Sequence, residues 1–352
     1  MYTILVLLFL SISLSVMSAI VFLAFAEKIG ITDAPGGRKR HQNKTPLVGG
    51  LIIFTGSLAF LFYRFDVNWF FLYLLIFTTL LIGLADDVFR LSASIRLFFQ
   101  VFIGFLLAKF LDLKLENVGN LFGFGEVLLS GSAVFLICFA TAAAKNALNM
   151  IDGVDGLAGS LALLPVSIIF FVFFRAGAFD LANFTIVIFG GLAVFMFLNF
   201  PFPWRKNAVC FLGDSGSTLL GLVVVYLLIK AASLGLLKPV LALYLFAMPL
   251  IDSAGVIFRR LMRGASISVA GRDHFHHILI DGGLSPRQTT LFILSLGVLI
   301  AAFGIILDHR NISEYILFYT FLMLIFLNLT MIVYSAFIIR IVIDFSKKLF
   351  PR

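Results

Sequence analysis

Charged side chains are scarce in this sequence of 352 residues. Asp, Glu, Lys and Arg make up 12% of it, whereas 61% of the residues are hydrophobic and the mean hydropathy is +1.11. A soluble domain usually carries about 25% charged residues, and a water-soluble fold of this length cannot bury so much apolar surface. The composition therefore excludes an ordinary soluble protein and predicts an integral membrane protein.

Cysteine is almost absent as well. The two cysteines, Cys138 and Cys210, both fall in or beside apolar segments. This pattern excludes a disulfide framework and a cysteine-based metal site, so we expect two small, buried side chains. The apolar N-terminal run lacks a basic n-region and is too long for a signal peptide, and we interpret it as the first membrane span.

Long apolar runs are abundant, and each is a candidate for a membrane span. A helix needs roughly 20 apolar residues to cross the hydrocarbon core of a bilayer. The runs lie at about 3–25, 47–63, 69–85, 96–111, 131–150, 158–175, 183–200, 214–232, 236–258, 288–307 and 315–341. We therefore predict an all-α polytopic membrane protein with about eleven transmembrane helices, forming one domain over residues 1–352.

The basic residues are divided unevenly between alternate connections. Of the 26 Lys and Arg residues, 19 fall in one set of connections. This set comprises about 26–46, 86–96, 145–157, 201–213, 259–287 and the tail from 340. The positive-inside rule places these loops in the cytoplasm, with the N-terminus outside and the C-terminus inside. The net charge of +8 follows from this bias and requires no nucleic-acid partner.

The first of these loops, 33–50, is basic and rich in glycine. Its charged cluster consists of Arg38, Lys39, Arg40, His41 and Lys44. Lys and Arg side chains hold phosphate oxygens, which favours a phosphate-facing role. A loop that only sets the membrane topology would explain the charges, but not the glycines and prolines among them.

Acidic and amide side chains mark the next two loops. Asp86 and Asp87 are adjacent carboxylates at the end of an apolar helix, where a cation, an arginine or a proton must relieve their repulsion. Asn146, Asn149 and Asp152 are spaced by three, which predicts that they share one helix face. Two Asp-Gly pairs begin at Asp152 and Asp155, and such oxygen donors suit Mg²⁺ or the polar edge of a nucleotide.

The last two motifs combine an aspartate at a helix start with a histidine cluster. Asp214 lies between glycines at the start of a span, where backbone N–H groups can receive an anion, although the neighbouring serines can also act as simple N-caps. Phe211, just upstream, can stack on a base or serve in plain packing, like many of the 43 Phe residues of the chain. Arg272, His274, His276 and His277 form a cluster that favours phosphate oxygens over zinc, because the nearby arginines oppose a divalent cation. Asp252 is a further polar contributor.

Together these motifs resemble those of the polyprenyl-phosphate N-acetylhexosamine-1-phosphate transferases. The resemblance runs in order from about residue 27 to 290. It rests on the Lys39–Gly50 segment, Asp86-Asp87, NxxNxxDGxDGL at 146–157, GDSGS at 213–217 and HFHH at 274–277. HFHH is similar to the HIHH loop of the WecA-type branch, with Phe275 in place of Ile, whereas the MraY-type branch has a run of consecutive histidines.

The resemblance implies an eleven-helix enzyme in a bacterial cytoplasmic membrane, with its active site facing the cytoplasm. Undecaprenyl phosphate would attack the β-phosphorus of a UDP-aminosugar, most simply UDP-GlcNAc, and UMP would leave. The product would start a lipid-linked envelope polysaccharide such as the lipopolysaccharide O-antigen. The resemblance also implies Mg²⁺ or Mn²⁺ as cofactor.

Residue roles are implied by the same motif matches. The catalytic set is Asp86, Asp87, Asp155, His276 and His277. The substrate-binding set is Lys44, Asn146, Asn149, Asp152, Asp155, Phe211, Arg272, His274, His276 and His277. The metal ligands are Asp214, Asp87 and Asp152. Within these sets Asp155 and Phe211 hold the uridine, and Asp86 either deprotonates the lipid phosphate or positions it electrostatically.

Several alternatives stay open at this point. Within the same family, the substrate can be UDP-MurNAc-pentapeptide or another UDP-N-acetylhexosamine. A transporter or lipid flippase would need charged residues within its spans, of which this sequence has very few. A scaffold protein descended from the enzyme would tolerate loss of Asp214. The sequence leaves the oligomeric state open, including a homodimer.

Overall fold

The computed structural model describes residues 2–33, 44–111, 113–205, 207–264, 271 and 273–333. For residues 332 and 333 it describes the backbone alone. The basic cluster at 38–41 and Arg272 lie outside these ranges, so their predicted roles stay predictions. The described part of the chain is an all-α bundle, as the sequence predicts.

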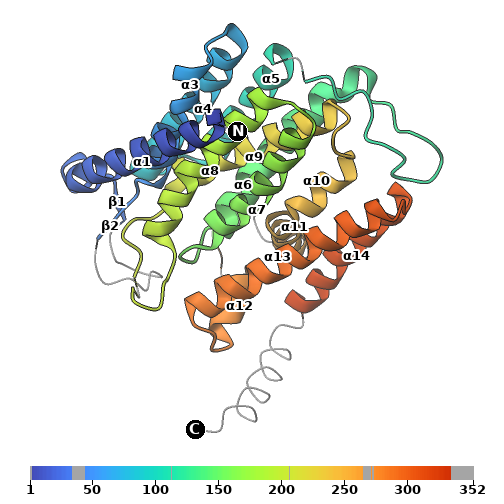
Figure 1. Cartoon of the computed structure of the whole chain (residues 1–352). Coiled ribbons are helices and arrows are strands. Elements are labelled where there is room, and N and C mark those ends of the chain that lie inside the picture. Colours follow the sequence, from blue (N-terminus) through green and yellow to red (C-terminus); the bar gives the residue numbers. More distant parts are fainter. Residues whose placement is uncertain are drawn as a thin grey trace.

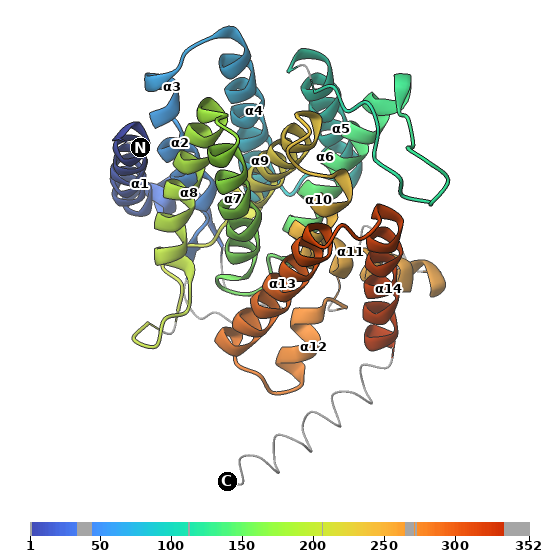
Figure 2. The same cartoon turned by 45° about the vertical axis from the view of Figure 1, so that its right-hand side comes forward.

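Nine helices in the described ranges are long and apolar enough to cross a membrane. They are α1 (Tyr2–Ile29), α4 (Val67–Phe89), α5 (Ala93–Phe110), α6 (Ala133–Ile151), α7 (Leu157–Arg175), α8 (Phe179–Asn199), α9 (Gly213–Ser233), α13 (Pro286–His309) and α14 (Glu314–Val333). Figures 1 and 2 show these helices packed side by side in one bundle. The protein is therefore a multi-span membrane protein.

Two of the predicted spans are broken or short. The stretch at 47–63 forms α2 (Gly49–Ser57) and α3 (Ala59–Tyr63), and at about 1.5 Å per residue it is too short to cross the hydrocarbon core. The stretch at 236–258 forms α10 (Pro239–Leu245) and α11 (Ala247–Met262), which meet at an angle of 82°. The apolar stretch predicted as a span at 236–258 is therefore helical but sharply bent, and it forms either one broken span or a re-entrant loop.

Small elements gather at one end of the bundle. The antiparallel pair β1 (Thr32–Asp33) and β2 (Thr45–Pro46) follows α1, and α12 (Phe275–Asp281) precedes α13. The 3-10 turn η1 (Ser130–Ser132) precedes α6 and therefore lies at the opposite end of that helix from Asn149 and the site. In both views α12 and the connection that follows α8 lie at the lower end. This end carries the predicted motifs, and we call it the site end.

Helix α9 is the buried centre of the bundle, and glycines bring its neighbours close to its first turn. A Cβ added at Gly83 of α4 would lie 2.3 Å from the Cα of Ser215, and one at Gly50 of α2 would lie 2.7 Å from the backbone nitrogen of Gly216. Such approaches are possible only where no side chain intervenes. Gly83 therefore places the end of α4, and Gly50 the start of α2, against the start of α9.

The helices extend further than the predicted loop boundaries. Because α6 continues to Ile151, Lys145 lies within a spanning helix rather than in a loop. Its side chain is 3% exposed, and its Nζ lies 3.3 Å from the hydroxyl of Thr79 on α4. A buried lysine inside the bundle is an exception to the nearly charge-free span interiors that the sequence suggests.

Candidate active site

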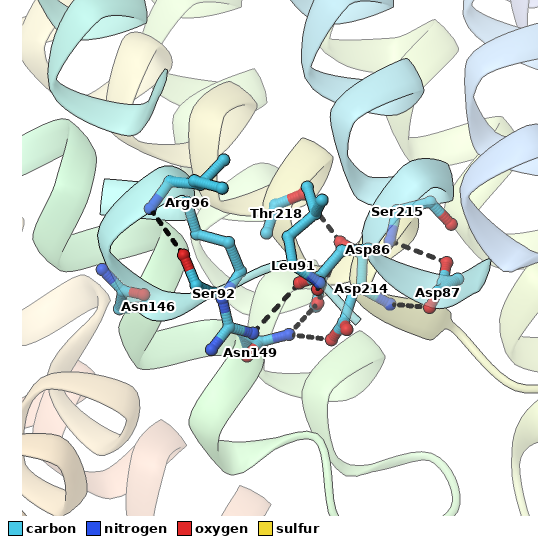
Figure 3. Close-up of polar contacts among 12 residues, drawn as sticks. Asp86, Asp87, Leu91, Ser92, Arg96, Asn146, Asn149, Asp214, Ser215 and Thr218 are labelled. Carbon is cyan, nitrogen blue, oxygen red and sulfur yellow. Dashed lines mark hydrogen bonds and ion pairs between the residues drawn. The ribbon is translucent and has the colours of Figure 1, made fainter. Parts of the chain in front are cut away.

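The site is built where the ends of α4 and α6 meet the beginning of α9 (Figure 3). Asp87 on α4 accepts hydrogen bonds from the backbone N–H groups of Asp214 (2.7 Å) and Ser215 (3.1 Å). It therefore caps α9 from another helix, at the positive end of the helix dipole. The hydroxyl of Ser217 bonds to a carbonyl of its own helix instead, so the N-cap role considered for the serines goes to Asp87.

Asp86 is buried beside Asp87 and has a different set of partners. Its carboxylate accepts from the backbone N–H of Leu91 (2.8 Å) and from Nη1 of Arg96 (3.0 Å). The Arg96 guanidinium also acts electrostatically on Asp214. Sequence reasoning missed Arg96, because it lies ten residues after Asp86 and only the turn before α5 brings it back.

The structure divides the polar stripe of α6 between two neighbouring helices. Asn149 donates hydrogen bonds to the Asp214 carboxylate and to the Ser217 hydroxyl on α9. Asn146 instead pairs with Gln100 on α5, each amide donating to the other at 2.6 and 3.2 Å. A spacing of three turns the helix face by about 60° at each step. Asn149 therefore faces Asp214 on α9, whereas Asn146 is turned far enough around the helix to face α5 instead.

The two Asp-Gly pairs form a turn after α6 that is fastened by a residue the sequence reasoning missed. The buried Asn199, at the end of α8, accepts from the N–H of Gly156 (2.7 Å) and donates to the carbonyl of Cys210 (2.8 Å). Asp155 accepts from the N–H of Ala208 at 3.3 Å. These bonds join the turn at 152–156 to the segment that leads into Asp214.

Asp152 carries the least compensated charge of the site. Burial raises its pKa well above the ordinary value, and the charges of Asp214, Asp155 and Asp87 raise it further. Every charge that acts strongly on Asp152 is thus negative. Hard oxygen donors with mutual repulsion are the setting in which a divalent cation is stabilised.

The donor chemistry fits Mg²⁺, although the geometry is not that of a finished metal cage. No three His, Cys, Asp or Glu side chains in the described ranges already converge on one point. Both oxygens of Asp87 are engaged by backbone N–H groups, whereas Asp214 shares one oxygen with Asn149. Asp214 and Asp152 are therefore the better placed of the three predicted ligands.

Phe211 is held by backbone pairing with the segment that follows the basic loop. Its N–H donates to the carbonyl of Pro46 (2.8 Å), and its carbonyl accepts from the N–H of Gly49 (3.1 Å). Lys44, in the same segment, is more than half exposed and pairs with Glu27 at the end of α1 at 2.9 Å. Phe211 thus lies at the edge of the site, and Lys44 points to a different partner.

The histidines meet the turn after α6. His276 is 1% exposed, and neither of its ring nitrogens has a hydrogen-bond partner among the described residues. Burial, followed by the neighbouring His277 and His274, lowers the pKa of His276 well below its ordinary value. Its Nε2 lies 2.3 Å from the position that a Cβ on Gly153 would take. The structure therefore brings the HFHH motif at 274–277 into contact with the Asp-Gly motif at 152–156.

Fold and site together define a membrane-embedded enzyme that gathers carboxylates, amides and histidines at one end of its helices. A family model for glycosyl transferase family 4 matches residues 69–232. The chain is also similar to three proteins that carry the name undecaprenyl-phosphate alpha-N-acetylglucosaminyl 1-phosphate transferase. The relative from Escherichia coli K12 is 34% identical, with 86% of this chain and 83% of the relative covered.

The other two relatives extend this similarity. The protein from Haemophilus influenzae is 33% identical over 92% of both chains, and that from Yersinia pestis is 33% identical over 85% of this chain and 83% of its own. The chain belongs to glycosyl transferase family 4. This confirms the family that the sequence motifs predict, and the protein is a phosphosugar transferase.

Proposed function

We propose that this protein transfers N-acetylglucosamine 1-phosphate from UDP-GlcNAc to undecaprenyl phosphate in a bacterial cytoplasmic membrane, and that its site end faces the cytoplasm. The observation that carries the proposal is the meeting of Asp86, Asp87 and Asp214 where spanning helices end. A lipid phosphate within the bilayer and a sugar nucleotide from the cytosol can meet only at such a boundary. The names of the relatives supply the sugar and the lipid.

The reaction exchanges one phosphoanhydride bond for another. An oxygen of the lipid phosphate forms a bond to the β-phosphorus of the sugar nucleotide. The bond from that phosphorus to the bridging oxygen breaks, and UMP leaves with the electron pair. The protein has to position two anionic groups against each other and to balance the negative charge that they bring together.

Asp214 and Asp152 are the residues that we expect to hold Mg²⁺ or Mn²⁺, with Asp87 shaping their surroundings. When bound, the cation neutralises charge on the diphosphate. Asn149 orients the Asp214 carboxylate through its amide, and the N-terminal turn of α9 fixes the backbone beneath it. The chain thus holds its principal acidic group by one side chain and one helix end.

Asp86 is better suited to positioning than to strong base chemistry. Its carboxylate already accepts from Arg96 and from the backbone N–H of Leu91, so both of its oxygens are engaged. A lipid monophosphate has a second pKa of about 6, by analogy with phosphorylated side chains. Little proton transfer is therefore needed near neutral pH, and the Asp86–Arg96 pair can orient the incoming phosphate.

The remaining residues are proposed to bind the uridine and the phosphate groups of the substrates. Asp155 and Phe211 lie on joined segments and are proposed to hold the uridine. His274, His276 and His277 are proposed to face phosphate oxygens, next to the turn at Gly153.

The test is an assay of purified protein with undecaprenyl phosphate, Mg²⁺ and one of three radiolabelled donors: UDP-GlcNAc, UDP-GalNAc or UDP-MurNAc-pentapeptide. We expect labelled lipid and an equal amount of UMP from UDP-GlcNAc. Turnover of UDP-MurNAc-pentapeptide alone would contradict the proposed sugar. Lipid movement without UMP release would contradict the reaction itself.

A further inference from the structure

The histidine segment is fastened to α11 by a buried carboxylate. Asp252 is 0% exposed, and its Oδ2 lies 2.8 Å from Nδ1 of His274. Its Oδ1 accepts the backbone N–H of Phe275, also at 2.8 Å. Both oxygens of one side chain therefore hold two successive residues at the start of α12.

A second set of contacts fixes the same segment from the next turns of α11. Asp273 pairs with Arg259 (3.3 Å) and with Arg260 (3.6 Å). Asp252 and Arg260 are eight residues apart and so lie on one face of the helix. One face of α11 thus presents a carboxylate to His274 and a guanidinium to Asp273, which sets both the position and the direction of the segment.

The fixed ring of His274 in turn supports the next histidine. The His274 and His276 rings are stacked, with centroids 5.5 Å apart and planes 8° apart. His276 lies against Gly153, in the turn that carries Asp152. A continuous line of contacts therefore runs from Asp252, inside the bundle, to the acidic side of the site.

A carboxylate can only accept a hydrogen bond, so the Nδ1 of His274 must carry the proton in this contact. Nε2 is then the ring nitrogen available to a ligand. It can accept from a protonated phosphate or, in the doubly protonated ring, donate to a phosphate oxygen. Carboxylates that select the orientation of a functional histidine in this way change activity strongly when they are removed.

We propose that Asp252 is a positioning residue that fixes the ring orientation of His274, and through it the histidine segment, for phosphate recognition. This inference rests on the proposed function of the site. Asp252 itself is buried and acts through His274. This inference can be tested separately from the proposed function, because the protonation of the His274 ring can be measured without any substrate.

The first test is Asp252→Asn, which keeps the size of the side chain and one acceptor for Phe275. The amide nitrogen is a donor, so it cannot accept from the Nδ1–H of His274. We expect kcat for UMP release to fall by about 10- to 100-fold, with a much smaller change in the KM for UDP-GlcNAc. The matched control is Ser253→Ala, whose hydroxyl bonds only to the carbonyl of Pro249 among the described contacts. We expect this control to stay within about twofold of the wild type.

A double-mutant cycle separates positioning from general stability. If Asp252 acts through His274, then Asp252→Asn should cost less than about threefold further activity in a His274→Asn background. Multiplicative losses would overturn the proposal, as would an Asp252→Asn variant with full kcat.

A third measurement is made on the wild-type protein and does not depend on turnover. Nitrogen-15 NMR of the wild-type protein, with histidine labelled, should show His274 protonated at Nδ1, and His274→Asn identifies its signal. An unprotonated Nδ1 would overturn the proposal. If no UDP-sugar gives UMP, the proposed function fails, whereas the NMR result still decides whether Asp252 orients the ring.

Discussion

The acidic cluster and the histidine segment are built by opposite means. Asp87 and Asp214 lie on spanning helices whose backbones touch at Gly83, so their separation is set by the bundle itself. The histidine segment lies between α11 and α13 and is held by side chains, namely Asp252 on His274 and two arginines on Asp273. The first region is rigid through backbone packing, and the second is held by a small number of polar contacts.

This difference suits two tasks. A group that holds a cation needs several oxygen atoms at fixed separations, which backbone packing supplies, whereas the orientation of a histidine ring can be set by single side-chain contacts. Substitutions at the acidic cluster should therefore act through chemistry or through bundle packing. Substitutions at the histidine segment should change activity while leaving the bundle intact.

The largest effect is expected from Asp214→Asn. The change removes the charge that we expect to bind the cation while keeping the size of the side chain. Magnesium-dependent UMP release should fall by about 1,000-fold, and the melting temperature in detergent should stay near that of the wild type. Asp180→Asn, at a partly exposed position at the start of α8, is the matched control and should keep its activity. Retained activity in Asp214→Asn would remove Asp214 from the cation site.

Gly83→Ala should come next, because it attacks the rigid region directly. The new Cβ would lie 2.3 Å from a backbone atom of Ser215, so α4 and α9 would have to separate. Overpacking of this kind costs about 1–3 kcal/mol, and we expect both a lower melting temperature and a loss of activity. Gly131→Ala is the control, since a Cβ there meets no atom within 4 Å. Equal behaviour of the two variants would show that this contact does not set the site.

Gly153→Ala, next to the histidine segment, should reduce activity more than stability. Its Cβ would meet the ring of His276, a side chain that can move, rather than backbone. Activity should fall by about tenfold through displacement of the ring, while the melting temperature should change less than in Gly83→Ala. A large loss of stability with normal kcat would contradict the contrast between the two regions.

The smallest effect concerns pH and metal removal. Burial and the charges of Asp214, Asp155 and Asp87 raise the pKa of Asp152. The stability that this group contributes is therefore present below the unfolded value of about 3.9 and is lost as pH rises toward the folded value. With EDTA, the melting temperature should fall as pH rises through this window.

Two comparisons check this pH dependence. Added Mg²⁺ should restore the melting temperature, and Asp152→Asn should flatten its dependence on pH. A wild-type melting temperature in EDTA that is constant from pH 4 upward would contradict the assignment. So would an Asp152→Asn variant that retains the full pH dependence of the wild type.

Much of the molecule could be predicted from the sequence. The apolar runs correspond to helices, apart from the 82° break between α10 and α11 and the short α2–α3 pair. The break lies at Phe246, just before Ala247 and Pro249, and Pro249 falls in the first turn of α11, where a proline is tolerated. A run of apolar residues shows that a segment is membrane-compatible, but it contains no signal for the angle at which two halves meet.

The sequence predicted which residues form the candidate site, but not which of them pair with each other. The sequence identified Asp86, Asp87 and Asp214 as acidic residues near a membrane boundary. It did not indicate that Asp87 caps α9 across 127 positions, or that Arg96 pairs with Asp86. It also missed the bridge made by Asn199, because a lone asparagine after an apolar helix is read as a simple helix end.

The sequence by itself determined that the protein is embedded in a lipid bilayer, and which chemical groups its loops carry. Both follow from hydropathy and motif composition, which depend on residues that are neighbours along the chain. The tertiary structure alone decided which oxygens are free and which are engaged. That outcome depends on close contacts such as Gly83 against Ser215 and Gly153 against His276, where the absence of a side chain lets distant segments touch. Such contacts follow from three-dimensional packing, so no local pattern in the sequence specifies them.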